Sequence, residues 1–153
     1  MANFNGQCSS AQQQLLERFL AMYQQLRAEN LHMLGEVYDE RILFQDPLHQ
    51  VRGLQPLRCY FAGLYQNIHS IHFDMSQVLM SPNHAAINWR MSFEHPKLNG
   101  GKLVLVDGMS QFIISDSNKV TYHRDYFDVG AMLYEQLPLL GCVIKRIKQR
   151  ASQ

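Results

Sequence analysis

The sequence lacks most of the features that mark secreted, membrane-spanning or nucleic-acid-binding proteins. Its three cysteines, Cys8, Cys59 and Cys142, are an odd number and lie far apart, so we predict free thiols in a reducing compartment. The first residues show neither the basic nor the apolar segment of a signal peptide, and no run approaches the roughly 18 apolar residues of a spanning helix. We therefore expect a cytoplasmic protein without a membrane partner.

Charge is also scarce. Charged residues make up 18% of the chain and the net charge is +1 at pH 7, which offers no broad positive surface to nucleic acid. The sequence has no glycine-rich phosphate-binding loop. His69 and His72 lie near Asp74, but no further residue has the spacing of a metal ligand. We expect no nucleic-acid partner, no metal and no cofactor.

The chain does contain enough apolar sequence for one folded domain. Its 153 residues are 46% hydrophobic, as in an ordinary globular protein. It has no internal repeat, low-complexity segment or linker. We predict a polar N-terminal tail over residues 1–9 and a single domain over residues 10–150.

Three amphipathic helices are predicted in the first half of the chain. Ser9 or Ser10 can cap the first, whose apolar residues recur every three to four positions, namely Leu15, Phe19, Met22, Tyr23 and Leu26. Asn30 can cap a shorter second helix that carries Leu31, Leu34 and Tyr38. After an extended segment over residues 42–47, Gly53 precedes a third helix, whose apolar stripe is Leu57, Tyr60, Phe61, Leu64, Tyr65 and Ile68.

The second half changes to the two-residue period of β-strands. Four strands are predicted over residues 71–80, 85–94, 102–115 and 120–128, joined by hairpin turns. A helical stretch follows, interrupted near Pro138 and Gly141, and its basic end over residues 145–150 suits a solvated helix terminus, a membrane surface or a partner. These elements predict an α+β roll, in which a curved antiparallel sheet wraps around the N-terminal helices.

The last predicted strand carries charged side chains where strands usually carry apolar ones. Because strand residues alternate between faces, His123, Asp125 and Phe127 share one side, and Arg124 and Asp128 share the other. A buried carboxylate has to be hydrogen-bonded, paired or held neutral, and the last condition is typical of acid-base sites. The strand is therefore predicted to be either a pocket wall or a paired structural element.

Three features together resemble the nuclear transport factor 2-like superfamily, a cone-shaped, cystatin-like fold shared by ketosteroid isomerases, SnoaL-like cyclases, limonene epoxide hydrolase and scytalone dehydratase. The first feature is the helix–helix–strand arrangement at the start of the chain, which ends at residues 44–47 and is followed by Gly53. The second is the order of the four strands, and the third is the sequence of the closing residues 123–128. The resemblance covers about residues 10–140. It implies a homodimer that binds a small apolar molecule.

The resemblance to ketosteroid isomerase implies roles for individual residues. Asp46 stands at the position of the catalytic base, Tyr23 at that of the oxyanion tyrosine, and Tyr38 at that of a second tyrosine in the hydrogen-bond network. A third tyrosine of that enzyme falls at Phe61, and its protonated acid falls near Ser110.

The closing strand is similar to that of limonene epoxide hydrolase, where Asp125 stands at one of two catalytic aspartates. The partner arginine and aspartate of that enzyme fall at Trp89 and Met91, so the epoxide-hydrolysing set is incomplete.

The register that the resemblance implies places Asp46, Tyr23 and Asp125 as catalytic groups in an apolar pocket, with ligand-binding residues Tyr38, Phe61, Tyr65, Trp89, Met91, Phe112, His123 and Phe127. This pocket suits proton transfer next to a carbonyl, as in an isomerase, cyclase or dehydratase. Each catalytic residue also has a structural interpretation: Asp46 as a turn cap, Tyr23 as a core residue and Asp125 as a partner of His123. The alternative function is a non-catalytic binding or regulatory domain that acts through a protein partner.

Overall fold

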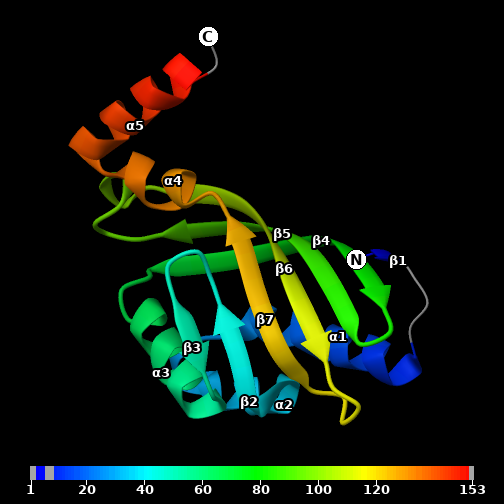
Figure 1. Cartoon of the computed structure of the whole chain (residues 1–153). Helices are drawn as coiled ribbons and strands as arrows, with labels where there is room; N and C mark the ends of the chain where they lie inside the picture. Colours follow the sequence, from blue (N-terminus) through cyan, green and yellow to red (C-terminus); the bar gives the residue numbers. More distant parts are fainter. Residues whose placement is uncertain (1–2, 6–8, 152–153) are drawn as a thin grey trace.

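A curved β-sheet forms the centre of the computed structural model, which describes residues 3–5 and 9–151 (Figure 1). Seven strands lie in this part of the chain: β1 Asn3–Asn5, β2 Tyr38–Gln45, β3 Gln50–Arg52, β4 Ser70–Ser81, β5 His84–Glu94, β6 Val104–Ile114 and β7 Val120–Phe127. Their order across the sheet is β1-β4-β5-β6-β7-β2-β3. The predicted α+β roll is confirmed.

The four predicted strands form the antiparallel meander β4 to β7. Its tight turns use residues with positive φ, Asn83 after β4 and Asn118 before β7, and asparagine tolerates this conformation better than most residues. Along β5, Ala85, Ile87, Trp89 and Phe93 are buried, as the sequence alternation predicts. The meander is therefore set by local sequence.

Two parallel pairings extend the sheet beyond the predicted antiparallel arrangement. Strand β2 pairs parallel with β7, and β1 pairs parallel with β4 through Gln77, Val78 and Leu79. Strand β1 lies within the predicted polar tail. Cys8 lies outside the described residues, whereas Cys59 and Cys142 are exposed free thiols.

Two helices cover one face of the sheet. Helix α1 (Ser10–Gln25) begins at a capping box in which Ser9 and Gln12 exchange hydrogen bonds, so the predicted cap is confirmed. Helix α3 (Leu54–Tyr65) begins after Gly53, whose φ of +92° favours glycine. Apolar residues of both helices and of the sheet form one buried core, which includes Leu15, Leu16, Phe19, Leu57, Phe61, Ile87 and Phe112.

The predicted second helix is wrong at its C-terminal end. A 3-10 turn, η1 (Ala28–Met33), leads into a short helix, α2 (Leu34–Val37), and Tyr38 is the first residue of β2. Tyr38 adopts the extended conformation because it pairs with Val120 of β7, far away in sequence. Asn30 lies within η1, where its side chain accepts from the amide of Arg27. Ile68 lies beyond the end of α3.

The C-terminal elements are α4 (Val129–Met132), η3 (Tyr134–Gln136) and α5 (Pro138–Ala151), and η2 (Asn99–Gly101) connects β5 to β6. Pro138 starts α5, but the predicted interruption at Gly141 is wrong, because Gly141 lies inside the helix. A Cβ atom there would come within 2.4 Å of the carbonyl oxygen of Glu135. Glycine at this position lets α5 approach η3. No helix in the described ranges is long and apolar enough to cross a membrane.

A pH-sensitive ion pair holds α5 against the end of β7. Lys148 Nζ lies 2.9 Å from Asp128 Oδ2 and 2.5 Å from Glu135 Oε1. Hydrogen bonds from Lys148 and the amide of Ala131 lower the pKa of Asp128, while Glu135 and Asp128 raise that of Lys148. The Asp128 contribution to stability is therefore complete above its ordinary pKa of 3.8 and is lost as pH falls through the lower folded-state value.

We expect α5 to loosen in acid for this reason. The carbonyl chemical shifts of α5 should move toward unfolded values as the pH falls below about 3.8. Lys148→Gln should produce the same shifts at neutral pH. Identical shifts in the variant and the wild type at neutral pH would show that the ion pair does not hold the helix.

Candidate functional site

A cavity of about 310 Å³ lies between the concave face of the sheet and helices α1 and α3. Most of its walls are apolar, including Phe19, Phe44, Phe61, Ile71, Phe73, Met75, Ile87, Met91, Phe93, Leu98, Phe127 and Met132. The volume and the apolar lining are typical of small-molecule sites. Five exposed lining residues, in the β2–β3 loop and at the end of α3, mark its mouth: Leu48, His49, Gly63, Leu64 and Asn67.

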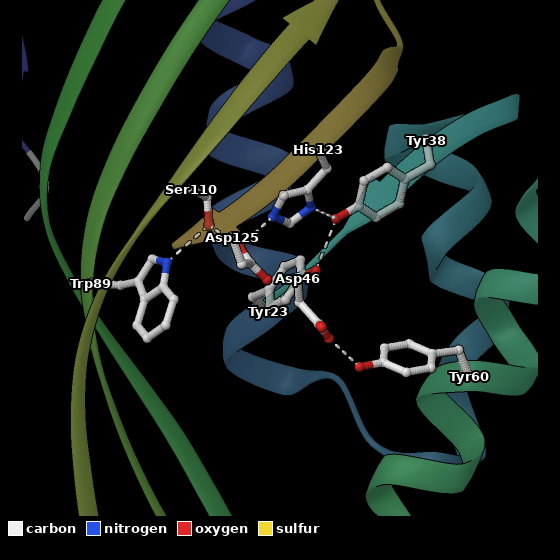
Figure 2. Close-up of polar contacts among 8 residues, drawn as sticks. All are labelled: Tyr23, Tyr38, Asp46, Tyr60, Trp89, Ser110, His123 and Asp125. Atoms are coloured by element: carbon white, nitrogen blue, oxygen red, sulfur yellow. Dashed lines mark hydrogen bonds and ion pairs between the residues drawn. The ribbon is translucent and has the colours of Figure 1, made fainter. Parts of the chain in front are cut away.

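Six polar side chains form one continuous hydrogen-bonded chain along the inner wall (Figure 2). Trp89 Nε1 lies 2.8 Å from Ser110 Oγ, which lies 2.5 Å from Asp125 Oδ1. The same Asp125 oxygen lies 2.7 Å from His123 Nε2. On the other side of the ring, His123 Nδ1 lies 2.7 Å from the Tyr38 hydroxyl, which lies 2.8 Å from the Tyr23 hydroxyl. Five strands and helices contribute: α1, β2, β5, β6 and β7. We call these residues the polar chain.

Proton counting fixes the direction of the first bonds in this chain. The indole N–H of Trp89 can only donate, so the Ser110 oxygen accepts it and the Ser110 hydroxyl donates to Asp125. Asp125 Oδ2 makes no hydrogen bond to any residue in the described part of the chain, although the carboxyl group lines the cavity. One carboxylate oxygen is thus held in place and the other is available.

The remaining bonds depend on how many protons His123 carries. With a neutral imidazole protonated at Nε2, His123 donates to Asp125, Tyr38 donates to His123, and Tyr23 donates to Tyr38. When His123 is an imidazolium, its Nδ1 donates to Tyr38 and Tyr38 donates to Tyr23. The hydroxyl of Tyr23 keeps its proton and becomes free to donate to a group outside the chain. Protonation of His123 therefore reverses the direction of the hydrogen bonds His123–Tyr38 and Tyr38–Tyr23.

Burial keeps both tyrosines of the chain neutral. The pKa of Tyr23 and that of Tyr38 are raised well above 10, chiefly because burial disfavours the charged phenolate. Burial also raises the pKa of Tyr65, on the cavity wall, to about 12. The phenols of this site can donate hydrogen bonds at neutral pH but do not serve as anionic bases.

Asp46 lines the cavity and also caps a turn. Its Oδ1 accepts from the amides of Leu48 and His49, both at 2.7 Å, and its Oδ2 accepts from the Tyr60 hydroxyl. Burial, followed by this contact with Asp46, raises the pKa of Tyr60. Figure 2 shows that the Asp46–Tyr60 pair is separate from the polar chain. The structural interpretation of Asp46 as a turn cap is thus realised.

The structure brings nine of the eleven predicted site residues to the cavity: Tyr23, Asp46, Phe61, Tyr65, Trp89, Met91, His123, Asp125 and Phe127. Two lie behind its wall. Phe112 is fully buried with its ring 4.8 Å from Phe19 and 4.5 Å from His123, and Tyr38 is buried beneath His123. Phe112 packs in the core and Tyr38 lies behind His123, so neither lines the pocket as predicted.

Sequence analysis missed Ser110 and Tyr60 as polar members of the site. The resemblance to ketosteroid isomerase had placed Ser110 near the position of a protonated acid, and Ser110 lies two residues before the inward-facing Phe112 on the same strand. Tyr60 was assigned only to the apolar stripe of its helix, since nothing local to residue 60 indicates that its hydroxyl reaches Asp46. Within the described ranges no three His, Cys, Asp or Glu side chains are grouped to hold a metal ion.

Gly108 leaves room for the indole that starts the polar chain. A Cβ atom at this position would lie within 2.2 Å of one Trp89 ring carbon and 2.3 Å of another. We expect Gly108→Ala to displace Trp89 and to lower the free energy of unfolding by about 1–3 kcal/mol, as overpacking does. Chemical denaturation would measure this cost.

Gly63→Ala is the matched control, because a Cβ atom at that helical position has nothing within 4 Å. It should leave stability unchanged or raise it by up to about 1 kcal/mol. Equal effects of the two substitutions would contradict the assigned role of Gly108.

Comparison with known proteins identifies related domains. A family model described as a SnoaL-like domain matches residues 17–123. A solved structure described as a candidate SnoaL-like polyketide cyclase from Jannaschia sp. CCS1 is similar with a TM-score of 0.71 and 16% identity, covering 84% of this chain and 95% of that one. Comparison with curated proteins gives no match.

Two further solved structures share the fold. A hypothetical protein with a ketosteroid isomerase-like fold from Catenulispora acidiphila DSM 44928, in complex with trimethylamine, has a TM-score of 0.69 and 14% identity, covering 81% of this chain and 93% of that one. An LEH-like epoxide hydrolase from M. tuberculosis has a TM-score of 0.64 and 15% identity, covering 81% and 87%. At these identities the likeness concerns the fold alone.

Proposed function

Because this chain belongs to the SnoaL-like domain family, we propose that it binds a small apolar carbonyl compound and transfers a proton at the carbon beside the carbonyl. One observation carries the proposal. Asp125 is held through Oδ1 by Ser110 and His123, and its Oδ2 is available in an apolar cavity. A positioned carboxylate with one available oxygen suits a general base.

The proposed reaction uses two members of the polar chain that line the cavity, Asp125 and Tyr23. Asp125 Oδ2 takes the proton from carbon, the C–H electron pair becomes the C=C bond of an enolate, and negative charge develops on the substrate oxygen. With His123 doubly protonated, the released hydroxyl of Tyr23 donates to that oxygen. Return of the proton to another carbon completes an isomerisation, and loss of a β-hydroxyl, which takes the proton from Asp125 and leaves as water, completes a dehydration.

A non-catalytic binding domain is the second candidate. It is favoured by the mutual hydrogen bonding of the cavity's polar groups, because Tyr60 is committed to Asp46 and, with neutral His123, Tyr23 is committed to Tyr38. Such a domain would hold a ligand without turnover and would act through a protein partner.

A single pair of measurements separates the two candidates. Trp89 is the only tryptophan and lines the cavity, so its fluorescence reports binding directly. The bicyclic ketone 2-tetralone is a suitable probe, since exchange of its α-hydrogens for deuterium can be followed by NMR. Saturable fluorescence change with catalysed exchange supports the enzyme, whereas the fluorescence change alone supports the binding domain. If 2-tetralone causes neither the fluorescence change nor catalysed exchange, both candidate functions are contradicted.

We also propose that the chain forms a cytoplasmic homodimer through the outer face of the sheet. This face leaves several large apolar side chains exposed, namely Leu79, Leu105, Met109, Ile113 and Tyr126. Exposed apolar patches of this kind are typical of interaction sites. Sedimentation velocity of the wild type and of Leu105→Asp would test the proposal, with a monomer expected only for the variant.

A further inference from the structure

Helix α5 carries an apolar stripe that no other residue in the described part of the chain covers. It extends away from the sheet and its two covering helices (Figure 1). Leu139 is 86% exposed, Leu140 41%, Val143 54% and Ile147 58%. Residues 139, 143 and 147 are spaced by four, so these side chains form one face about 12 Å long. We call them, with Leu140, the α5 stripe.

Contacts with the body of the domain hold this stripe outward. Gly141 packs against Glu135, and Lys148 pairs with Asp128 and Glu135. At 3.6 residues per turn, positions 141 and 148 lie on the side of the helix nearly opposite 143. The exposure of the stripe is therefore a consequence of how α5 is anchored.

The same helix concentrates the positive charge of the protein. It contains Lys145, Arg146, Lys148 and Arg150 and no acidic residue. The whole chain has 14 basic and 13 acidic residues, so the remainder has 10 basic and 13 acidic, a formal charge of −3 beside the +4 of α5. Arg146 and Arg150 lie seven residues after Leu139 and Val143 and therefore flank the stripe. An anionic surface complements this arrangement.

We propose that α5 is an interfacial helix that docks the protein on anionic lipid membranes. Aliphatic side chains beside arginine and lysine are typical of helices that lie in the plane of a membrane interface, with the apolar face among the acyl chains and the cations at the headgroups. This contact differs from a spanning helix, which α5 is too short and too charged to form. It departs from the expectation of no membrane partner.

Two other occupants fit the stripe less well. Parallel pairing with α5 of a second copy would bring Arg146 and Arg150 of both helices together, and like charges in contact are destabilising. A protein groove is disfavoured by the composition of the stripe, since Leu and Val are under-represented among interface hot spots and the stripe has no aromatic side chain.

The test is sedimentation of the full chain with lipid vesicles. At low salt the wild type should bind vesicles of equimolar phosphatidylcholine and phosphatidylserine and should not bind vesicles of phosphatidylcholine alone, and physiological salt should weaken binding. Val143→Asp with Ile147→Asp should abolish binding. Arg146→Glu with Arg150→Glu should weaken it at least about tenfold. Lys148 is left unchanged because it anchors the helix.

Arg18→Glu with Arg41→Glu provides the matched control. Both residues are exposed and lie on α1 and β2, away from α5. The two substitutions change the net charge by the same amount as Arg146→Glu with Arg150→Glu. This variant should keep most of the binding. No binding to anionic vesicles at low salt, or equal losses in the two charge variants, would overturn the proposal. Loss of a wild-type dimer in the Val143→Asp, Ile147→Asp variant would also overturn it and assign the stripe to a second copy.

Discussion

Replacing Asp125 by asparagine is expected to slow deuterium exchange at the α-carbon of 2-tetralone by about 1,000-fold, within the usual range for removal of a general base. The amide oxygen of asparagine can still accept from Ser110 and His123, so the polar chain keeps most of its bonds. What disappears is the carboxylate oxygen Oδ2, which accepts no hydrogen bond from the described residues. Binding, followed by Trp89 fluorescence, should change much less than exchange.

Asp46→Asn is the matched comparison. An asparagine at residue 46 can still cap the turn by accepting from the amides of Leu48 and His49, so the substitution removes charge beside Tyr60 without removing the turn. We expect exchange to stay within about tenfold of the wild type. The opposite result, with exchange lost in Asp46→Asn and kept in Asp125→Asn, would transfer the base to Asp46, where the resemblance to ketosteroid isomerase placed it.

Phe112→Ala should cause the largest loss of stability, about 3–5 kcal/mol in the free energy of unfolding. Its ring is fully buried and contacts Phe19 and His123, so truncation leaves a cavity that these neighbours cannot fill without moving. Urea denaturation would measure the loss. The experiment also tests whether Phe112 is a core residue and not a ligand contact.

Phe127→Ala makes the same chemical change at a partly exposed residue of the cavity wall. It should cost clearly less stability than Phe112→Ala, because burial of the ring is incomplete. It should also weaken the binding of 2-tetralone more strongly, as the affinity of an apolar pocket depends on its lining. A larger loss of stability in Phe127→Ala than in Phe112→Ala would contradict the assignment of Phe112 to the core. A larger loss of 2-tetralone binding in Phe112→Ala than in Phe127→Ala would also contradict it.

The buried part of each strand could be predicted because side-chain direction in a strand is a local property. The alternation along β5 places Trp89 and Phe93 inward, and the alternation along β7 places His123 and Asp125 on one face. The capping box at Ser9 and the turn at Gly53 are equally local. The α+β fold and nine of the cavity residues follow from such patterns together with the family resemblance.

What joins these residues depends on pairings between distant parts of the chain. Tyr38 leaves the predicted helix because β2 pairs with β7, and that pairing brings its hydroxyl to His123, 85 residues away. Tyr60 reaches Asp46 only after α3 packs on the sheet, and Ser110 reaches Asp125 across β6 and β7.

The sequence by itself thus determined helices α1 and α3, the four strands of the meander and which of their faces are apolar, because periodicity and capping act over a few residues. Only the tertiary structure decided that Asp125 keeps one available oxygen, that Phe112 belongs to the core and that the α5 stripe stays exposed. Each of these depends on which surfaces meet when the chain folds, and no local pattern encodes that contact.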